Sequence, residues 1–139
     1  MKSFLTVMAL VVSTQSFANC YQALGTVPAH IPQKICIEKE VKSKTIVLVS
    51  DELGRVELPT TKTLYMTAEQ YYILSEGEVY DGSEYESCGR QQIVQARFSG
   101  FVENNQLRPV ASILELTESF VRDTCHGRTE YTNYKYEQI

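Results

Sequence analysis

The stretch that decides the fold runs from residue 92 to residue 120 and reads QIVQARFSGFVENNQLRPVASILELTESF. In its first half, small or apolar residues alternate with other residues, and one face collects Val94, Ala96, Phe98, Gly100 and Val102. The segment Glu103-Asn104-Asn105-Gln106 interrupts this alternation and is typical of a tight turn. We therefore predict two long antiparallel strands joined at the two asparagines, with the Val94 face buried.

The pairing of these two strands follows from the position of their turn. If the two asparagines are its central residues, Ala96 faces Ile113 across the hairpin. The apolar phase changes beyond Ile113, because Leu114 and Leu116 would otherwise point outward and the intervening glutamate inward. We therefore predict a β-bulge after Ile113.

Short apolar or β-branched runs fill the rest of the chain, with turn residues between them. Gly54 ends one such turn, where the lack of a Cβ suits a left-handed conformation. Crossover helices of the βαβ type are missing from the pattern. Besides the hairpin, we expect strands near residues 34–40, 45–49, 56–58, 62–66, 71–73, 79–80 and 129–136. The fold class is thus all-β, a small antiparallel β-sandwich or β-barrel with at most one short helix.

Two local signals interrupt this series of strands. Thr67 and Gln70 have the spacing of a capping box, so a short helix is the alternative to a strand at that point. Residues 75–78 read Ser-Glu-Gly-Glu and predict a turn. A short helix is therefore an alternative at one place, and a turn is expected to interrupt the strands at the other.

Residues 1–18 have the features of an export signal that is cleaved. Lys2 precedes the apolar run Phe4–Val12, and the small residues Ser16 and Ala18 close the segment. The run is about nine residues long, against about twenty for a membrane-spanning helix, so we predict no transmembrane segment. Cleavage after Ala18 leaves 121 of the 139 residues. We predict an exported protein, either periplasmic or secreted from a bacterium.

The exported part divides into two regions. Gly25, Pro28 and Pro32, together with the lack of sustained periodicity, predict an irregular N-terminal arm over residues 19–33. A single β-domain follows over residues 34–139.

The four cysteines, Cys20, Cys36, Cys88 and Cys125, form an even set in an exported chain and predict two disulfides. Four cysteines allow three pairings. The long hairpin brings Cys88 and Cys125 together at its open end, which leaves Cys20 to pair with Cys36. A lipid on Cys20 is the alternative. We expect none, because Asn19 stands where a lipobox has a small residue and because lipidation would leave one thiol unpaired.

The charge balance limits the classes of partner. The chain has 13 Lys and Arg against 17 Asp and Glu, a net charge of −4, and loss of Lys2 brings it to about −5. The charges are scattered rather than grouped by sign. This balance argues against nucleic acid or an anionic membrane surface and favours a basic partner.

Motifs for catalysis or metal binding are weak in this sequence. His30 and His126 have no acid or nucleophile at a motif spacing. Cys125 and His126 are adjacent, but we prefer a bridged cysteine beside a surface histidine. The acidic loop at residues 81–86 lacks the ligand pattern of an EF-hand. We therefore predict no enzymatic activity and no catalytic, metal or cofactor site.

Tyrosine is the most suggestive residue type, with nine tyrosines and no tryptophan in the chain. Tyrosine supplies rigid, amphipathic contact area at interfaces and planes on which sugars stack, although it is also a good strand former at sheet rims. The candidate binding surface comprises Tyr71, Tyr72, Tyr80, Tyr85, Tyr131, Tyr134 and Tyr136.

The leading hypothesis is a non-catalytic β-domain that binds a protein or glycan of the cell envelope or exterior. One specific version is an inhibitor of a cationic hydrolase such as a lysozyme. The alternatives are a structural or accessory component of the envelope, which associates with its own copies or with other proteins, and a small secreted hydrolase.

Overall fold

The computed structural model describes residues 17–42 and 44–139. Residues 1–16 of the predicted export signal lie outside the described residues. The described ranges contain eight strands and no helix, and hence no helix that could cross a membrane. The strands are β1 (Phe17–Ala23), β2 (Lys34–Glu38), β3 (Thr45–Ser50), β4 (Gly54–Tyr65), β5 (Gln70–Asp81), β6 (Gln91–Glu103), β7 (Gln106–Val121) and β8 (Glu130–Gln138).

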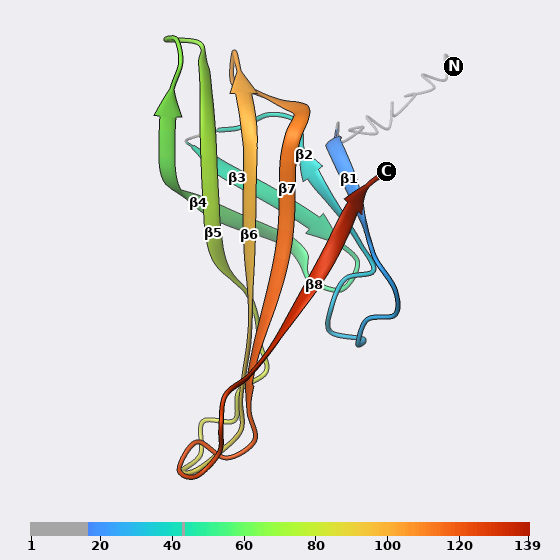
Figure 1. Ribbon diagram of the computed structural model, residues 1–139, viewed down its shortest axis with the longest axis vertical. Helices are drawn as coiled ribbons and strands as arrows, with labels where there is room; N and C mark the ends of the chain where they lie inside the picture. Colours follow the sequence, from blue (N-terminus) through green and yellow to red (C-terminus); the bar gives the residue numbers. More distant parts are fainter. Residues whose placement is uncertain (1–16, 43) are drawn as a thin grey trace, which may run out of the picture.

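The strands form one closed antiparallel barrel in which each strand pairs with its neighbours in the sequence. β1 closes the cylinder, because it pairs with β2 on one side and with β8 on the other. Strands β5 to β8 extend as a ribbon beyond the shorter strands β1 to β3 and end in two loops (Figure 1). The all-β prediction is confirmed, and of the two predicted forms the chain adopts the barrel.

The hairpin of β6 and β7 turns where the sequence predicts. Asn104 and Asn105 have φ values of 51° and 59°, the left-handed conformation that a type I′ turn requires. Next to the turn, Val102 pairs with Leu107 and Glu103 with Gln106.

The bulge in this hairpin lies closer to the turn than predicted. The register shifts opposite Gly100, so Ala96 pairs with Leu116, and the predicted pairing of Ala96 with Ile113 is wrong. Pro109 falls within the shifted segment of β7 and has no N–H to donate to a continuous ladder, which is the physical reason for a break at this point. The shift brings Leu116 to the inside, as the change of apolar phase requires.

The barrel interior is packed with apolar side chains. The predicted buried face is confirmed, because Val94, Ala96, Phe98, Gly100 and Val102 are all buried. Other strands contribute Tyr21, Ile35, Ile37, Ile46, Leu48, Leu58, Ile73, Leu114 and Leu116. Burial of each large side chain stabilises the fold by about 1.5–3 kcal/mol.

The N-terminal arm is only partly irregular. From Asn19 onward, every second residue of β1 is buried, namely Asn19, Tyr21 and Ala23. The irregular arm predicted over residues 19–33 is therefore wrong for the part that forms β1. A segment this short shows no clear periodicity in the sequence, and it becomes a strand because β2 and β8 pair with it on both sides. The loop at residues 24–33 is free of strand, as predicted.

Thr67 begins a turn rather than a helix. Its Oγ1 accepts hydrogen bonds from the backbone N–H groups of Glu69 (3.3 Å) and Gln70 (2.9 Å). The capping-box spacing therefore serves the connection between β4 and β5, where the same local bonds satisfy the backbone of a tight turn.

The turn predicted over residues 75–78 is wrong, because β5 continues through this segment. Gly77 pairs with Ala96 of β6. A Cβ on Gly77 would lie 3.1 Å from Cδ2 of Leu58, so the small residue permits close packing inside the barrel. The glycine is thus required by a side chain of β4 that is distant in sequence, and not by a turn.

Both predicted disulfides are present, and each closes a different part of the fold. Cys20 and Cys36 are paired residues on β1 and β2. Cys88 and Cys125 join the loops at the far end of the ribbon. A register centred on the two asparagines without a shift predicts Cys88 opposite Val121. The observed partner of Val121 is Gln91, because the register shift displaces the open end of the hairpin. Two disulfides indicate an oxidising compartment.

Candidate functional site

The ribbon of β5 to β8 ends in a feature that we call the projecting end, formed by the loops at residues 82–90 and 122–129 (Figure 1). The disulfide between Cys88 and Cys125 joins the two loops. The N–H of Thr124 also donates to the carbonyl oxygen of Gly89 at 3.0 Å. The two loops therefore form one unit although they are distant in sequence.

The backbone of the projecting end is held by short-range hydrogen bonds. Asp81 and Asp123 each accept an N–H from the residue two positions later, at 2.8 and 2.9 Å. Gly89 allows a close approach, since a Cβ there would lie 2.4 Å from the carbonyl oxygen of Glu84. These contacts order the backbone of both loops.

An open hollow of about 370 Å³ lies beside the first of these loops. Its lining includes three carboxylates, those of Asp81, Glu84 and Glu86, and one guanidinium, that of Arg90. Arg90 forms an ion pair with Glu84, with Nη2 3.4 Å from Oε1. Tyr85 borders the hollow with 88% of its surface exposed. The hollow therefore combines an excess of negative charge with an aromatic side chain.

Tyr85 and Asp81 fix each other's orientation and charge. The Tyr85 hydroxyl donates a hydrogen bond to Asp81 Oδ2. This bond, with those from Ser83, lowers the pKa of Asp81 below its ordinary value and raises the pKa of Tyr85 above its own. Asp81 is thus a carboxylate and Tyr85 a neutral phenol at neutral pH, and their hydrogen bond holds the phenol beside the hollow.

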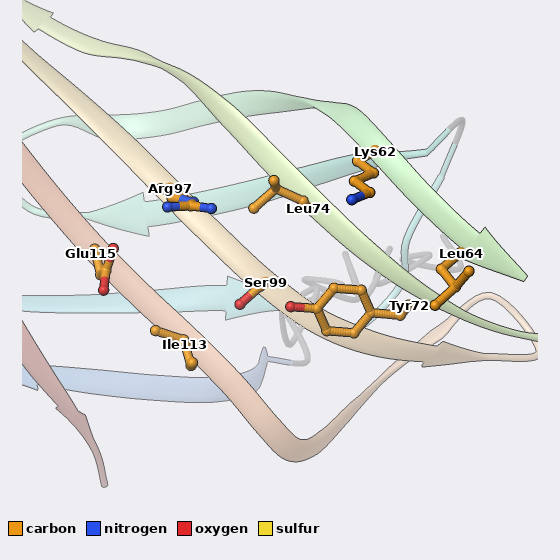
Figure 2. Close-up of a pocket in the computed structure, with 8 residues that line it drawn as sticks. All are labelled: Lys62, Leu64, Tyr72, Leu74, Arg97, Ser99, Ile113 and Glu115. Atoms are coloured by element: carbon orange, nitrogen blue, oxygen red, sulfur yellow. The ribbon is translucent and has the colours of Figure 1, made fainter.

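The seven tyrosines of the predicted binding surface lie in several environments. Tyr85 and Tyr131 are the exposed members, and Tyr131 is the second residue of β8, close to the second loop. Tyr72 lines a separate hollow on the outer face of the barrel (Figure 2). The other four pack against or within the core: Tyr71, Tyr80, Tyr134 and Tyr136. Of the seven predicted tyrosines, Tyr85 and Tyr131 are therefore the two that are exposed at or next to the projecting end.

A polar cluster around Glu118 is a feature that sequence reasoning did not identify. Glu118 points into the barrel from β7 and is only 7% exposed. Its Oε1 lies 2.7 Å from both His30 Nε2 and Gln92 Nε2, and its Oε2 accepts a hydrogen bond of 2.6 Å from the Tyr134 hydroxyl. The His30 ring stacks on Tyr80, with centroids 5.0 Å apart. The cluster thus attaches the loop between β1 and β2 to strands β6, β7 and β8.

The protonation state of this cluster follows from its hydrogen bonds. Burial raises the pKa of Glu118, but hydrogen bonds from Gln92, Tyr134 and His30 outweigh it, and the net pKa lies below the ordinary 4.5. Burial and the Glu118 hydrogen bond raise the pKa of Tyr134. An ionised carboxylate only accepts hydrogen bonds, so His30 Nε2 carries the hydrogen of the contact with Glu118. The arrangement therefore supplies hydrogen-bond donors to a buried carboxylate.

The lowered pKa of Glu118 predicts a specific acid sensitivity. A carboxylate with a lowered pKa in the folded state stabilises the protein above its unfolded-state pKa, and this contribution is lost as the pH falls through the folded-state value. We expect the urea midpoint of the wild type to fall below about pH 4.5 more steeply than that of Glu118→Gln, whose amide does not titrate. Unfolding curves between pH 7 and pH 3 measure this difference, and parallel pH profiles would contradict the assignment.

Cys125 and His126 do not form a nucleophile and base. Cys125 is bonded to Cys88, so its thiol is not free. His126 is exposed, and its Nδ1 lies 3.4 Å from Oδ2 of Asp123. The sulfur atoms of both cysteines lie within 4.8 Å of the Asp123 carboxylate, but as a disulfide they are not thiolate ligands for a metal. The predicted surface histidine beside a bridged cysteine is confirmed.

No protein-family model, curated protein or solved structure matches this chain.

Proposed function

We propose that this chain is an exported, non-catalytic binding domain whose projecting end recognises a basic protein outside the cytoplasm. The observation that carries the proposal is Tyr85, an exposed aromatic ring held by Asp81 at the rim of a hollow with three carboxylates and one guanidinium. A lysine or arginine side chain of a partner fits this chemistry, because the carboxylates attract it and the ring offers a cation–π surface.

Two further properties support a basic protein partner. The whole chain has a net charge of −4, which steers the approach of a cationic protein. The two loops are cross-linked by Cys88–Cys125 and project beyond the barrel, a shape suited to entry into a concave surface (Figure 1). The predicted export signal and the disulfides support a location in the periplasm or outside the cell.

Tyr85→Ala is expected to weaken binding about 30-fold, because an aromatic residue at the centre of an interface contributes about 2 kcal/mol. The measurement uses the oxidised chain as immobilised bait and the basic proteins of an envelope extract, enriched by cation exchange, as prey. Tyr65→Ala is the matched control, because Tyr65 is also exposed but ends β4 at the opposite end of the barrel. A basic protein retained by the wild type and by Tyr65→Ala, but not by Tyr85→Ala, supports the proposal. Equal retention by all three baits contradicts it.

The hydrolase-inhibitor version of this proposal has a direct assay. A cationic lysozyme is titrated with the oxidised chain, and its activity is followed at low and high salt. Inhibition that weakens with salt and with Tyr85→Ala supports an inhibitor that acts through the projecting end. Full lysozyme activity at excess chain excludes this enzyme as the partner.

A further inference from the structure

The outer face of the ribbon bears a row of four charges that alternate in sign. Glu76, Arg97, Glu115 and Lys135 are paired neighbours on β5, β6, β7 and β8. All four are exposed, and within the row Arg97 Nε lies 3.1 Å from Glu76 Oε1. From β5 to β8 the row therefore reads negative, positive, negative, positive. If a second copy of the row is placed opposite the first in reversed strand order, each charge meets a charge of the other sign.

Next to this row, on the side away from the projecting end, apolar side chains share the outer face with Lys62. A hollow of about 470 Å³ lies there, and Leu64, Tyr72, Leu74 and Ile113 contribute to its lining (Figure 2). Ser99 lies at its floor on β6 and is 9% exposed, although its side chain is on the outer face. Ile113, the neighbour of Ser99 on β7, is 56% exposed and stands beside the hollow. The face thus carries an apolar projection and, one strand away, a recess.

We propose that two copies of this chain associate through this outer face, about a two-fold axis that runs parallel to the strands between β6 and β7. Such an axis places β6 of one copy over β7 of the other. Arg97 then faces Glu115 of the second copy on both sides of the axis, and Glu76 lies on the side of Lys135, so the row brings together unlike charges. The same operation places Ile113 over the recess at Ser99. One rotation therefore satisfies both the charges and the apolar shape, as a symmetric dimer interface requires.

The charge row also selects this orientation against the reversed one. A two-fold axis perpendicular to the strands would place each residue of the row over its own copy, so that glutamate would face glutamate and arginine would face arginine. Like charges in contact at an interface cost several kcal/mol. The face is therefore specific for one arrangement of a second copy. In that arrangement both projecting ends lie at the same end of the dimer and remain uncovered.

Sedimentation velocity on the oxidised chain at about 100 µM tests the dimer, since this concentration detects association with micromolar Kd. We expect the wild type to sediment as a dimer. Arg97→Glu and Glu115→Arg each create two like-charge contacts in the dimer, and each variant alone should dimerise about 100-fold more weakly. Arg128→Glu, in the second loop of the projecting end, makes the same change of charge away from the face and should leave the dimer intact.

Mixing the two face variants gives the sharpest test. In a mixed dimer, the unchanged Glu115 of the Arg97→Glu chain faces the unchanged Arg97 of the Glu115→Arg chain. The two substituted positions also face each other, and they carry unlike charges because both signs are exchanged. Native mass spectrometry should therefore show a heterodimer in the mixture, although each variant is monomeric alone. Misfolding of either variant cannot produce this rescue. A monomeric wild type, or a mixture that stays monomeric, overturns the proposal.

This inference is independent of the function proposed for the projecting end. Tyr85→Ala should remain a dimer, because Tyr85 is outside the outer face. Monomeric Arg97→Glu should still bind a basic partner through Tyr85. Loss of one property without the other identifies which of the two proposals is wrong.

Discussion

Replacement of Glu118 by alanine is expected to lower the free energy of unfolding by about 3 kcal/mol. The carboxylate is 7% exposed and accepts hydrogen bonds from His30, Gln92 and Tyr134. Its removal leaves these three donors without their acceptor at the end of the barrel, and an unsatisfied buried donor costs about 1–3 kcal/mol. Urea unfolding of the oxidised chain, followed by far-ultraviolet circular dichroism, measures the change.

Two companion variants separate this network from a general loss of charge. Glu130→Ala removes an exposed glutamate at the start of β8 and should change stability by less than about 0.5 kcal/mol. Glu118→Gln keeps an oxygen that accepts hydrogen bonds and should be intermediate between the wild type and Glu118→Ala. If Glu118→Ala were as stable as Glu130→Ala, the cluster would not attach the loop of residues 24–33 to the barrel in the way inferred.

The sequence predicts the β6–β7 hairpin well because its determinants are local. Alternation identifies the buried residues of β6, and Asn104 and Asn105 identify the turn by their tolerance of positive φ. The need for a bulge is also visible, since the apolar phase changes along β7. The position of the bulge is not visible, because the apolar phase changes only beyond Ile113, whereas the register shifts between Arg108 and Ile113. The disulfide pairing survives this error, since a small register shift still leaves Cys88 and Cys125 at the same end.

The Glu118 cluster, by contrast, depends on closure of the barrel. His30 and Glu118 are 88 residues apart, and only the packing of the loop at residues 24–33 against the ribbon brings them together. One local signal was present, because Glu118 continues the inward phase of Leu114 and Leu116. An acid at an inward position predicts a buried carboxylate, which requires hydrogen-bond donors from elsewhere in the fold. The sequence around Glu118 does not predict which residues provide these donors.

The predicted tyrosine surface is another feature that the local sequence specifies only in part. Composition indicates that tyrosines are available for contacts, but strand parity decides which of them point outward. Tyr134 and Tyr136 alternate inward on β8, and their hydroxyls donate to Glu118 and to the carbonyl oxygen of Pro32. Tyr85 escapes this rule because it lies in a loop. The candidate site is therefore restricted to the loops, where the side chains are not packed in the core.

Removal of the disulfide at the projecting end, by Cys88→Ser with Cys125→Ser, is expected to lower the free energy of unfolding by about 4 kcal/mol. The bond joins residues 37 positions apart, and in the chain-entropy model its loss frees the unfolded chain to that extent. The pair Cys20→Ser with Cys36→Ser opens a separation of 16 and should cost about 3 kcal/mol. Chemical unfolding of both double variants measures the two values.

The two double variants should differ far more in binding than in stability. Loss of Cys88–Cys125 frees the loop that carries Tyr85 from the loop that carries Thr124, so the hollow is no longer ordered before a partner arrives. Loss of Cys20–Cys36 acts between β1 and β2 and leaves both loops joined. At a temperature where both variants are folded, the first should lose retention of a basic partner and the second should keep it. Equal retention would mean that order in the projecting end is not required for recognition, and it would direct the search to the outer face instead.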